Sequence, residues 1–247
     1  MEDLIKTKPY KDITLEFDTS RHMFFANGEK LPSVTHFTGI IDKSRPRMFW
    51  QEKLKREDLI SKWKRSEGRL TLQDITESTA LHRVRKEEAA SIGTLAHDWA
   101  ENFSKGIKQP MPTIKEVKNA VLGFLKWIEE EGFKLTPKGS ERHILSKKYW
   151  YAGIVDAEGT RKEKLAVIDY KTSSGIYEEM MFQTAGYQQA LQEMTGKKYD
   201  ERWIVRFDKK TGDFEPYLCG PFEKDIKGFL GCREIVLRID EIKNQKS

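Results

Sequence analysis

One stretch constrains the fold of this chain more than any other: residues 153–171, GIVDAEGTRKEKLAVIDYK. Its two ends are rich in strand-forming residues and its middle is polar and turn-like, so we expect a β-hairpin. If residues 162–163 form a two-residue turn, counting outward along the antiparallel pair sets Asp156 opposite Asp169. Lys171 lies two residues beyond Asp169 and therefore shares its face of the hairpin.

This register predicts a small charged site. Two carboxylates with Cβ atoms about 5 Å apart repel one another, and a divalent cation between them removes that cost. Hard oxygen ligands suit Mg²⁺ or Mn²⁺, and Lys171 could contact a water or a phosphate oxygen beside the ion. Such a set suffices for metal-assisted phosphodiester hydrolysis. A bare D-x-K tripeptide is more often part of an ordinary salt-bridged hairpin, so the rest of the chain has to decide.

Composition limits the class of protein. The chain has 247 residues, of which 38% are hydrophobic, enough for one sizeable core with an appended lobe. The net charge of +5 permits a polyanionic partner without requiring one. Cys219 and Cys232 lack a zinc-type spacing and predict no disulfide framework, which favours a reducing cytosol. We find no apolar run of membrane-spanning length and no signal-peptide core at the N-terminus.

Periodicity and turn signals predict helices and strands along the whole chain. Thr113 is the expected N-cap of a helix, with Glu116 as its capping-box partner. The C-terminal half reads β-β-β-α-β-β-α after a helical middle, which predicts an α/β or α+β layered domain with helices packed on a sheet. The expected elements are strands over 12–18 and 22–26, a short helix after Ser33, helices over 43–69 and 71–105 (the second with or without a break near Gly93), a helix over 113–131, strands over 142–150, 151–158 and 165–170, a helix over 177–195, strands over 202–207 and 214–219, and a helix over 222–242.

The segment 43–69 is basic, and Trp50 and Trp63 lie among its lysines and arginines. Such interleaving can grip a phosphate backbone and stack on bases. An amphipathic helix with tryptophan inward and lysine outward explains the same pattern and is the commoner case. If the segment binds DNA, the contacts we expect are from Trp50, Lys53, Lys55 and Arg56.

Four short motifs follow one another in a characteristic order. They are G-T-x-x-H at 93–97, G-x-x-D at 153–156, D-x-K-T at 169–172 and Q-x3-Y at 183–187. In this order, and on these expected elements, they resemble the PD-(D/E)xK nuclease superfamily, specifically its RecB-like branch. The segment LPSVTHFTGIIDK also resembles phage-encoded exonucleases of this branch, and the mitochondrial genome maintenance exonuclease is a more distant relative. The resemblance covers roughly residues 31–195.

The resemblance implies a fold and a division of the chain. The fold would be a restriction-endonuclease-like core, with a mixed central β-sheet flanked by helices and a mostly helical N-terminal lobe. Residues 1–112 would form the N-terminal strands and the helical lobe, which guides DNA and contributes His97. Residues 113–247 would form the nuclease core, the two parts making one continuous compact unit.

The resemblance also implies roles for single residues. The side chains of Asp156, Asp169 and His97 and the backbone carbonyl of Tyr170 would be metal ligands. Lys171 would orient the attacking water and offset charge on the phosphorane.

Five further residues are expected near this site. Glu141 precedes the first core strand, where this branch often has a glutamate near the metal; a solvated loop carboxylate is the alternative. Gln183 and Tyr187 share a helix face and would touch the DNA backbone or support the lysine, unless they merely belong to an interior helix. Thr172 and Ser173 would donate to a phosphate or cap the next segment.

Two features of some RecB-like nucleases are missing from this sequence, which limits the forms that the chain can resemble. Several RecB-like nucleases hold an iron–sulfur cluster on four cysteines, and two cysteines exclude such a cluster within one chain. No nucleotide-binding P-loop is visible, so the chain does not resemble the helicase-fused form.

The function implied is a stand-alone deoxyribonuclease dependent on Mg²⁺ or Mn²⁺. It would be an exonuclease of phage type that acts in DNA replication, recombination or repair, in the cytoplasm of a bacterium or of a phage-infected host. Its partners would be DNA, as single strands or duplex ends, and a recombination or replication protein, without a membrane. A structure-specific or restriction-type endonuclease on the same core is one alternative. A catalytically silent DNA-binding protein is another, although a silent copy has no chemical reason to keep Asp156, Asp169 and Lys171.

Overall fold

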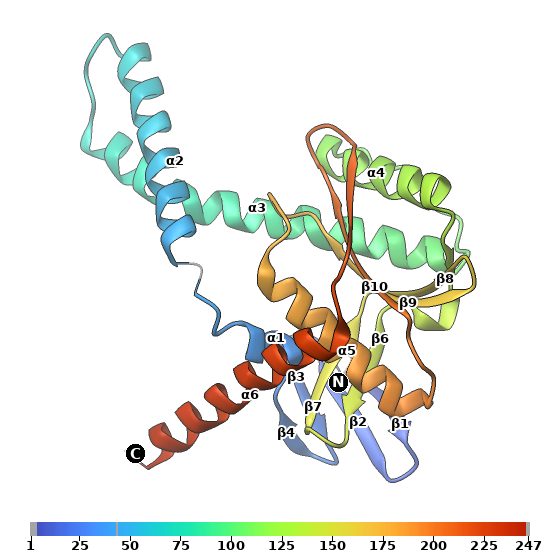
Figure 1. The fold of residues 1–247 in the computed structure, drawn as a ribbon. Helices are drawn as coiled ribbons and strands as arrows, with labels where there is room; N and C mark the ends of the chain where they lie inside the picture. The colour runs from blue at the N-terminus through green and yellow to red at the C-terminus, as the bar shows by residue number, and fades with distance from the viewer. Residues whose placement is uncertain (1–3, 43, 246–247) are drawn as a thin grey trace. The chain divides into compact units, whose positions relative to one another are not determined.

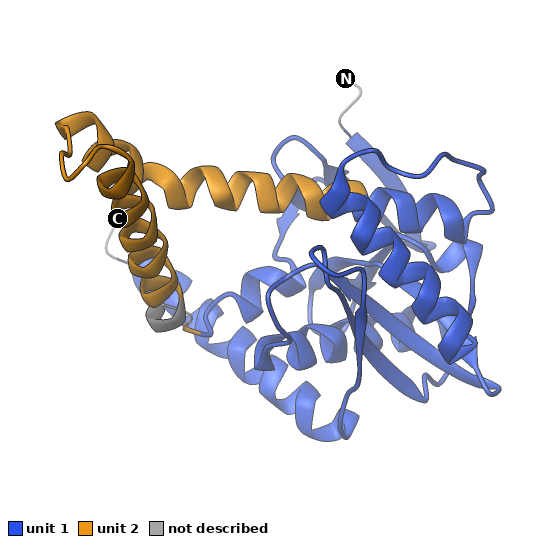
Figure 2. Ribbon diagram, turned by 90° about the horizontal axis from the view of Figure 1, so that it is seen from above, with its two compact units in different colours: residues 1–41, 96–247 blue, residues 42–95 orange. Residues whose placement is uncertain are grey.

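The computed structural model describes residues 4–42 and 44–245. The chain forms two compact units, residues 1–41 with 96–247 (unit 1) and residues 42–95 (unit 2), coloured separately in Figure 2. Residues 96–112 therefore group with the C-terminal half, which differs from the division at residue 112 suggested by the sequence. Among the described residues, no helix combines the length and apolar character needed to cross a bilayer.

Unit 2 consists of helix α2 (Ser44–Arg65) and the first part of helix α3 (Leu72–Ser104). Polar contacts join the two helices: Lys62 forms ion pairs with Asp58 at 3.3 Å and Glu77 at 2.9 Å, and the buried Ser78 hydroxyl donates to Asp58 at 2.6 Å. Helix α3 runs through Gly93 without interruption, so one long helix, rather than two, is correct.

The N-terminal strands of unit 1 form an antiparallel four-stranded sheet in chain order. Side chains on one face of this sheet, including those of Leu15 and Phe24, are buried in a hydrophobic cluster. Ser33 caps the short helix that follows by accepting from the backbone N–H of His36 at 3.1 Å, as expected. These elements are β1 (Leu4–Tyr10), β2 (Ile13–Asp18), β3 (Met23–Ala26), β4 (Glu29–Leu31) and α1 (Val34–Thr38).

The core of unit 1 is a five-stranded mixed sheet in the order β11-β10-β9-β8-β5, with β6 and β7 paired separately (Figure 1). Strands β9 and β10 are parallel and the other neighbouring pairs are antiparallel. The predicted α+β class, with a mixed sheet flanked by helices, is confirmed. The remaining elements are α4 (Lys115–Glu131), β5 (Lys134–Leu135), the 3₁₀ turn η1 (Pro137–Gly139), β6 (Arg142–Ser146), β7 (Tyr151–Val155), β8 (Ala157–Arg161), β9 (Lys164–Lys171), α5 (Glu178–Thr195), β10 (Glu201–Phe207), β11 (Phe214–Leu218) and α6 (Phe222–Asn244).

Alternate residues of β9 contribute to two hydrophobic cores. Ala166, Ile168 and Tyr170 pack with α4 and the end of α3, whereas Val167 packs with α5 and α6. Successive side chains of a strand point to opposite faces of the sheet, so neighbouring residues of β9 enter different cores. Asp169 shares the parity of Val167, so its carboxylate lies on the α5 side of the sheet, where α5 supplies Gln183.

Helices α5 and α6 meet through a reciprocal exchange of glycine and phenylalanine. A Cβ atom on Gly186 would lie 2.9 Å from ring carbons of Phe229, and one on Gly228 would lie 2.6 Å from the ring of Phe182. Each helix therefore receives the other's ring where it has no side chain of its own, which fixes the position of α5 against α6.

Helix α4 begins one residue later than a Thr113 cap requires. Its N-cap is Ile114, which offers no side-chain hydrogen bond, so the capping box predicted for Thr113 and Glu116 is wrong. Its end is as predicted, because Gly132 adopts φ +66° and its N–H returns to the carbonyl of Ile128 at 3.1 Å.

Candidate active site

The site is built on the hairpin of β8 and β9. Its two turn residues, Lys162 and Glu163, have φ +48° and +66°, the left-handed pair that a two-residue hairpin turn of type I′ requires. The antiparallel register continues to Ala157 opposite Ile168, which is the register expected from the sequence.

Asp156 occupies the bend between β7 and β8, where the chain passes from one sheet to another. A single strand over 151–158 was expected, so the break at this residue corrects that expectation. Instead of continuing the ladder, the Asp156 carboxylate accepts from the backbone N–H of Tyr170 at 2.7 Å. This hydrogen bond fixes Asp156 beside the end of β9.

Three groups from distant parts of unit 1 converge beside this bend. One ligand atom each of His97, Glu141 and Asp156 lies within 4.8 Å of the others, and His97 Nδ1 lies 3.8 Å from Asp156 Oδ2. His97 comes from α3, Glu141 from the residue before β6, and all three are half-buried. Two carboxylates and an imidazole at this spacing could hold a metal ion.

Glu141 has a strained backbone conformation, which places its side chain near His97 and Asp156. Its φ of +45° lies in the left-handed region, which costs a residue with a Cβ about 1 kcal/mol. Its N–H donates to the Asp156 carbonyl at 3.1 Å, which holds the residue beside the bend. Burial, reinforced by the charge of Asp156, raises the pKa of Glu141 to about 8. Without a cation the carboxyl is therefore largely protonated at neutral pH, and a bound cation would favour its ionised form.

Asp169 lies within the same site but has different partners. It is fully buried, and Lys171 Nζ lies 2.5 Å from its Oδ2. The Gln183 side-chain amide donates to Asp169 Oδ1 at 3.2 Å and to the Tyr187 hydroxyl at 2.8 Å. Gln183 and Tyr187 thus share a helix face, and Gln183 links the tyrosine hydroxyl to the aspartate.

The pKa values of Asp169 and Lys171 are both raised, but for different reasons. Burial raises the pKa of Asp169 to about 6, even though Lys171 opposes the rise. For Lys171, burial alone would lower the pKa, but the charges of Asp169 and Asp156 outweigh it and leave the pKa above its usual value. Lys171 is therefore an ammonium group at neutral pH, a donor and a positive charge rather than a base.

The glycine of the G-x-x-D motif has a packing role. A Cβ atom on Gly153 would lie 3.0 Å from the Tyr187 ring and 3.3 Å from Val34. The missing side chain lets α5 approach β7, and this approach brings the face of α5 that carries Gln183 toward Asp169.

The remaining predicted residues lie in several places. The main chain of Tyr170 is beside Asp156, while its ring is buried in the core next to α4. The Ser173 hydroxyl donates to the Gly175 carbonyl at 2.8 Å within a local turn, so it does not cap α5, and Thr172, next to it, is half-buried.

The four residues expected to contact DNA lie on α2, in unit 2. Trp50 and Trp63 are 44% and 51% exposed, so the expectation that the tryptophans face inward is wrong. Lys53 forms an exposed ion pair with Glu57 at 3.9 Å. Trp50, Lys53, Lys55 and Arg56 are all exposed on α2.

Sequence reasoning missed the acidic neighbours of His97 on α3. The charges of Glu101 and Asp98 both raise the pKa of Glu141, so both lie near it. The signal was available for Glu101, which follows His97 by four residues and so shares its helix face.

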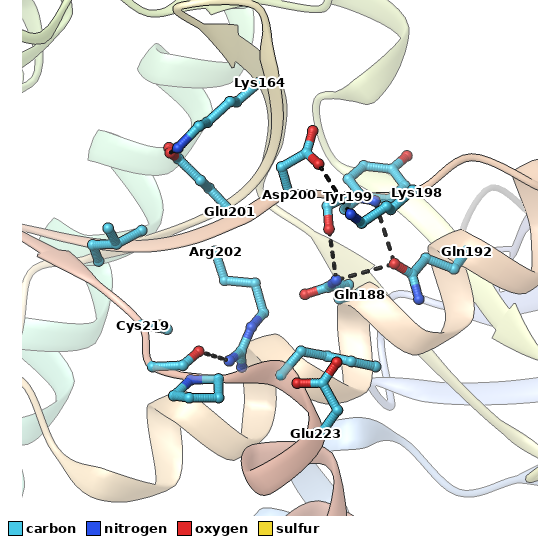
Figure 3. A pocket seen from close by; sticks show the side chains of 14 residues that line it. Lys164, Gln188, Gln192, Lys198, Tyr199, Asp200, Glu201, Arg202, Cys219 and Glu223 are labelled. Carbon is cyan, nitrogen blue, oxygen red and sulfur yellow. Dashed lines mark hydrogen bonds and ion pairs between the residues drawn. The ribbon is translucent and has the colours of Figure 1, made fainter.

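A pocket of about 520 Å³ between α5, β10 and the start of α6 contains none of the predicted site residues (Figure 3). Its charged groups are largely satisfied: Arg202 pairs with Asp225 at 2.7 Å, and Lys164 pairs with Glu201 at 2.9 Å. The pocket therefore shows no group poised for chemistry.

Comparisons with known proteins add little detail. No protein-family model matches the sequence, and no curated protein matches it. Among solved structures, the chain is similar to a crystal structure from Eubacterium rectale called a "putative exonuclease", with a TM-score of 0.42 and 12% sequence identity. The similarity covers 63% of this chain and 69% of the other.

Proposed function

We propose that this protein is a divalent-metal-dependent DNA nuclease of the RecB-like PD-(D/E)xK type. One observation supports the proposal most: His97, Glu141 and Asp156, which could hold a metal ion, lie beside the end of the hairpin that carries the Asp169–Lys171 ion pair. Side chains able to hold a metal ion and a lysine able to stabilise negative charge are thereby brought together from distant positions in the chain.

Mg²⁺ or Mn²⁺ fits the donor set best. Asp156 and Glu141 offer hard carboxylate oxygens, and His97 adds an imidazole, which favours Mn²⁺ over Mg²⁺ more than an all-oxygen site would. An ion held there would supply a more acidic bound water and would offset charge at the scissile phosphate. Asp169 would complete the site from the α5 side, although its closest partner is Lys171.

The residues of the chain itself position the substrate and stabilise charge. Lys171, kept protonated by Asp169 and Asp156, would donate to a phosphate oxygen and offset the charge that develops there. Gln183 holds Asp169 through one hydrogen bond and is itself held by Tyr187. The hydrogen bond from the Tyr170 N–H holds the Asp156 carboxylate in a fixed orientation, so the carboxylate would already be positioned to bind a metal ion.

An exonuclease is the form we favour, by analogy with the phage-encoded relatives of this motif set. It would act on DNA in replication, recombination or repair. Both cysteines are free thiols, which fits a reducing compartment such as the cytoplasm. An endonuclease on the same core is the second candidate.

The decisive experiment is digestion of end-labelled single- and double-stranded DNA with Mg²⁺, with Mn²⁺ or with EDTA. We expect cleavage that requires metal and releases mononucleotides or short products from the ends. A closed circular substrate separates the candidates, because only an endonuclease cuts it. DNA binding without cleavage under any metal would instead identify a silent DNA-binding protein.

Two lysines of strand β9 provide a matched control. Lys171→Met should abolish cleavage, whereas Lys164→Met, at the exposed other end of the strand, should leave it intact. Equal activity of the two variants would place the chemistry elsewhere in the molecule.

A further inference from the structure

A buried carboxylate lies behind the segment that carries Glu141. Glu158, on β8, is 5% exposed and comes two residues after Asp156. Its Oε1 accepts from Arg142 Nη1 at 2.7 Å, and its Oε2 accepts from the Tyr199 hydroxyl, which is also buried. Burying a charge costs free energy unless it is paired, and here a cation on one oxygen and a hydroxyl on the other offset that cost.

The cation that pairs with Glu158 is the direct neighbour of a proposed metal ligand, since Arg142 follows Glu141 at the start of β6. The turn before that ligand also lies against Glu158. A Cβ atom on Gly139 would be 2.6 Å from Glu158 Cβ, so the missing side chain lets η1 pack on the stem of this carboxylate. The Thr136 N–H donates to the Glu158 carbonyl at 2.8 Å. Glu158 therefore holds the chain on both sides of Glu141.

The start of β8 connects two of the proposed metal ligands. Asp156 directly precedes this strand, and its carbonyl accepts from the Glu141 N–H at 3.1 Å. The piece of chain from Asp156 to Glu158 thus supplies one ligand and anchors the segment that supplies another. Metal affinity depends on how ligands are oriented, and losing a residue that orients them typically costs about 10- to 100-fold in affinity.

We propose that Glu158 is a positioning residue of the metal site. Through Arg142 it sets where Glu141 lies relative to Asp156, and thereby the affinity for a divalent cation. This inference rests on the proposed nuclease function, and Glu158 acts in it without itself binding the metal ion. An ion pair that only supported the fold would affect stability alone, whereas a positioning residue also changes metal affinity.

Titration of Mn²⁺ into the protein without DNA, followed by calorimetry, measures this affinity without relying on cleavage. His97→Ala identifies the heat that belongs to the site, because it removes a proposed ligand and leaves Glu158 in place. We expect Glu158→Gln, which keeps the side-chain volume and removes the charge, to raise the Mn²⁺ dissociation constant about tenfold or more.

Glu201→Gln is the matched control. Glu201 is also a carboxylate of the core sheet, 8% exposed, with one cation partner, Lys164 at 2.9 Å, and one aromatic donor, Trp203 Nε1 at 2.8 Å. It lies on β10 and lines the pocket of Figure 3, which contains none of the predicted site residues. Its substitution should lower the melting temperature, as that of Glu158 does, but should leave Mn²⁺ binding unchanged.

Variants of Arg142 test the route by which Glu158 acts. Arg142→Met should weaken Mn²⁺ binding as Glu158→Gln does, and the double variant should weaken it no further, because both changes remove the same contact. The double variant leaves neither member of the ion pair without its partner, so it should fold even if Glu158→Gln does not. Arg142→Lys keeps a cation and should bind Mn²⁺ more tightly than Arg142→Met.

The outcomes separate this inference from the function on which it rests. If wild type binds Mn²⁺ in a way that depends on His97, but Glu158→Gln or the double variant binds equally well, the positioning role is overturned and the nuclease stands. An equal loss of affinity in Glu201→Gln would also overturn it, since the effect would then follow from lower stability. If wild type shows no Mn²⁺ binding that depends on His97, the proposed metal site itself fails.

Discussion

Asp169 is a carboxylate whose charge is balanced inside the protein. Its side chain is 1% exposed and lies 2.5 Å from the ammonium of Lys171. Lys171→Met would leave that carboxylate buried without its cation, so we expect the unfolding free energy to fall by roughly 3 kcal/mol. Urea denaturation in EDTA measures the loss.

The double variant Asp169→Asn/Lys171→Met separates charge balance from chemistry. It removes both charges, so most of the lost stability should return, while DNA cleavage should stay absent. If the single variant were as stable as wild type, the ion pair would contribute little to the fold.

Glu141 makes stability depend on pH. Its pKa rises from 4.5 to about 8 in the folded protein, so between these values the folded state binds more protons than the unfolded state. The stability that this carboxyl contributes is present below pH 4.5 and is lost as pH rises through 8. Without metal, wild type should therefore lose stability relative to Glu141→Gln over this range, by on the order of a few kcal/mol.

Added Mg²⁺ or Mn²⁺ should reverse this loss, because metal ligands bind as deprotonated groups. The measurement is a set of melting curves from pH 5 to 8, with and without metal, for both proteins. If the melting temperatures of wild type and Glu141→Gln depended on pH in the same way, the pKa of Glu141 would not be raised in the folded protein.

The position of Glu141 also shows why part of the site is invisible in the sequence. The carboxylate reaches Asp156 because its backbone turns into the left-handed region and bonds a carbonyl fifteen residues later in the chain. Neither event has a local signature, since glutamate does not favour that conformation. The hairpin residues were predictable because strand alternation and a two-residue turn determine which side chains face one another.

Among the elements, the β8–β9 hairpin and the long helices followed from periodicity, whereas boundaries set by tertiary contacts did not. The chain leaves one sheet and enters another at Asp156, a change that no feature of AGIVDAE reveals. The two-residue strand β5 exists only because it pairs with β8. Its formation depends on a partner distant in the chain rather than on its own sequence.

The start of α4 provides a test at this scale. Ile114 caps the helix without a side-chain hydrogen bond and is 48% exposed, so Ile114→Asp should raise the unfolding free energy by about 1 kcal/mol. Thr113→Ala is the control. It should change stability little, although a loss of about 1 kcal/mol would mean that Thr113 is the cap after all. Chemical denaturation of both variants decides.

At the scale of the whole molecule, the chain has a net charge of +5 and forms two compact units. Helix α2 of unit 2 exposes lysines together with tryptophans, a combination suited to a phosphate backbone and its bases. We expect Lys53→Glu/Lys55→Glu to weaken DNA binding for all sequences and to flatten its salt dependence, because fewer counterions are released.

A control with the same change in net charge distinguishes a local contact from general repulsion. Lys197→Glu/Lys227→Glu alters exposed lysines of unit 1 and should affect the salt dependence much less. Equal effects of the two pairs, in a salt titration of DNA affinity, would mean that only total charge matters and that α2 is simply a solvated helix.

The packing of the Phe229 and Phe182 rings against Gly186 and Gly228 limits which substitutions this sequence can accept during evolution. Gly186 accommodates Phe229 and Gly228 accommodates Phe182, so neither position in a pair can vary alone. A lineage that acquires a side chain at 186 should carry a smaller residue at 229, and the same should hold for 228 and 182. The two pairs should therefore covary among homologues, while Gln183 on the same helix changes independently of both.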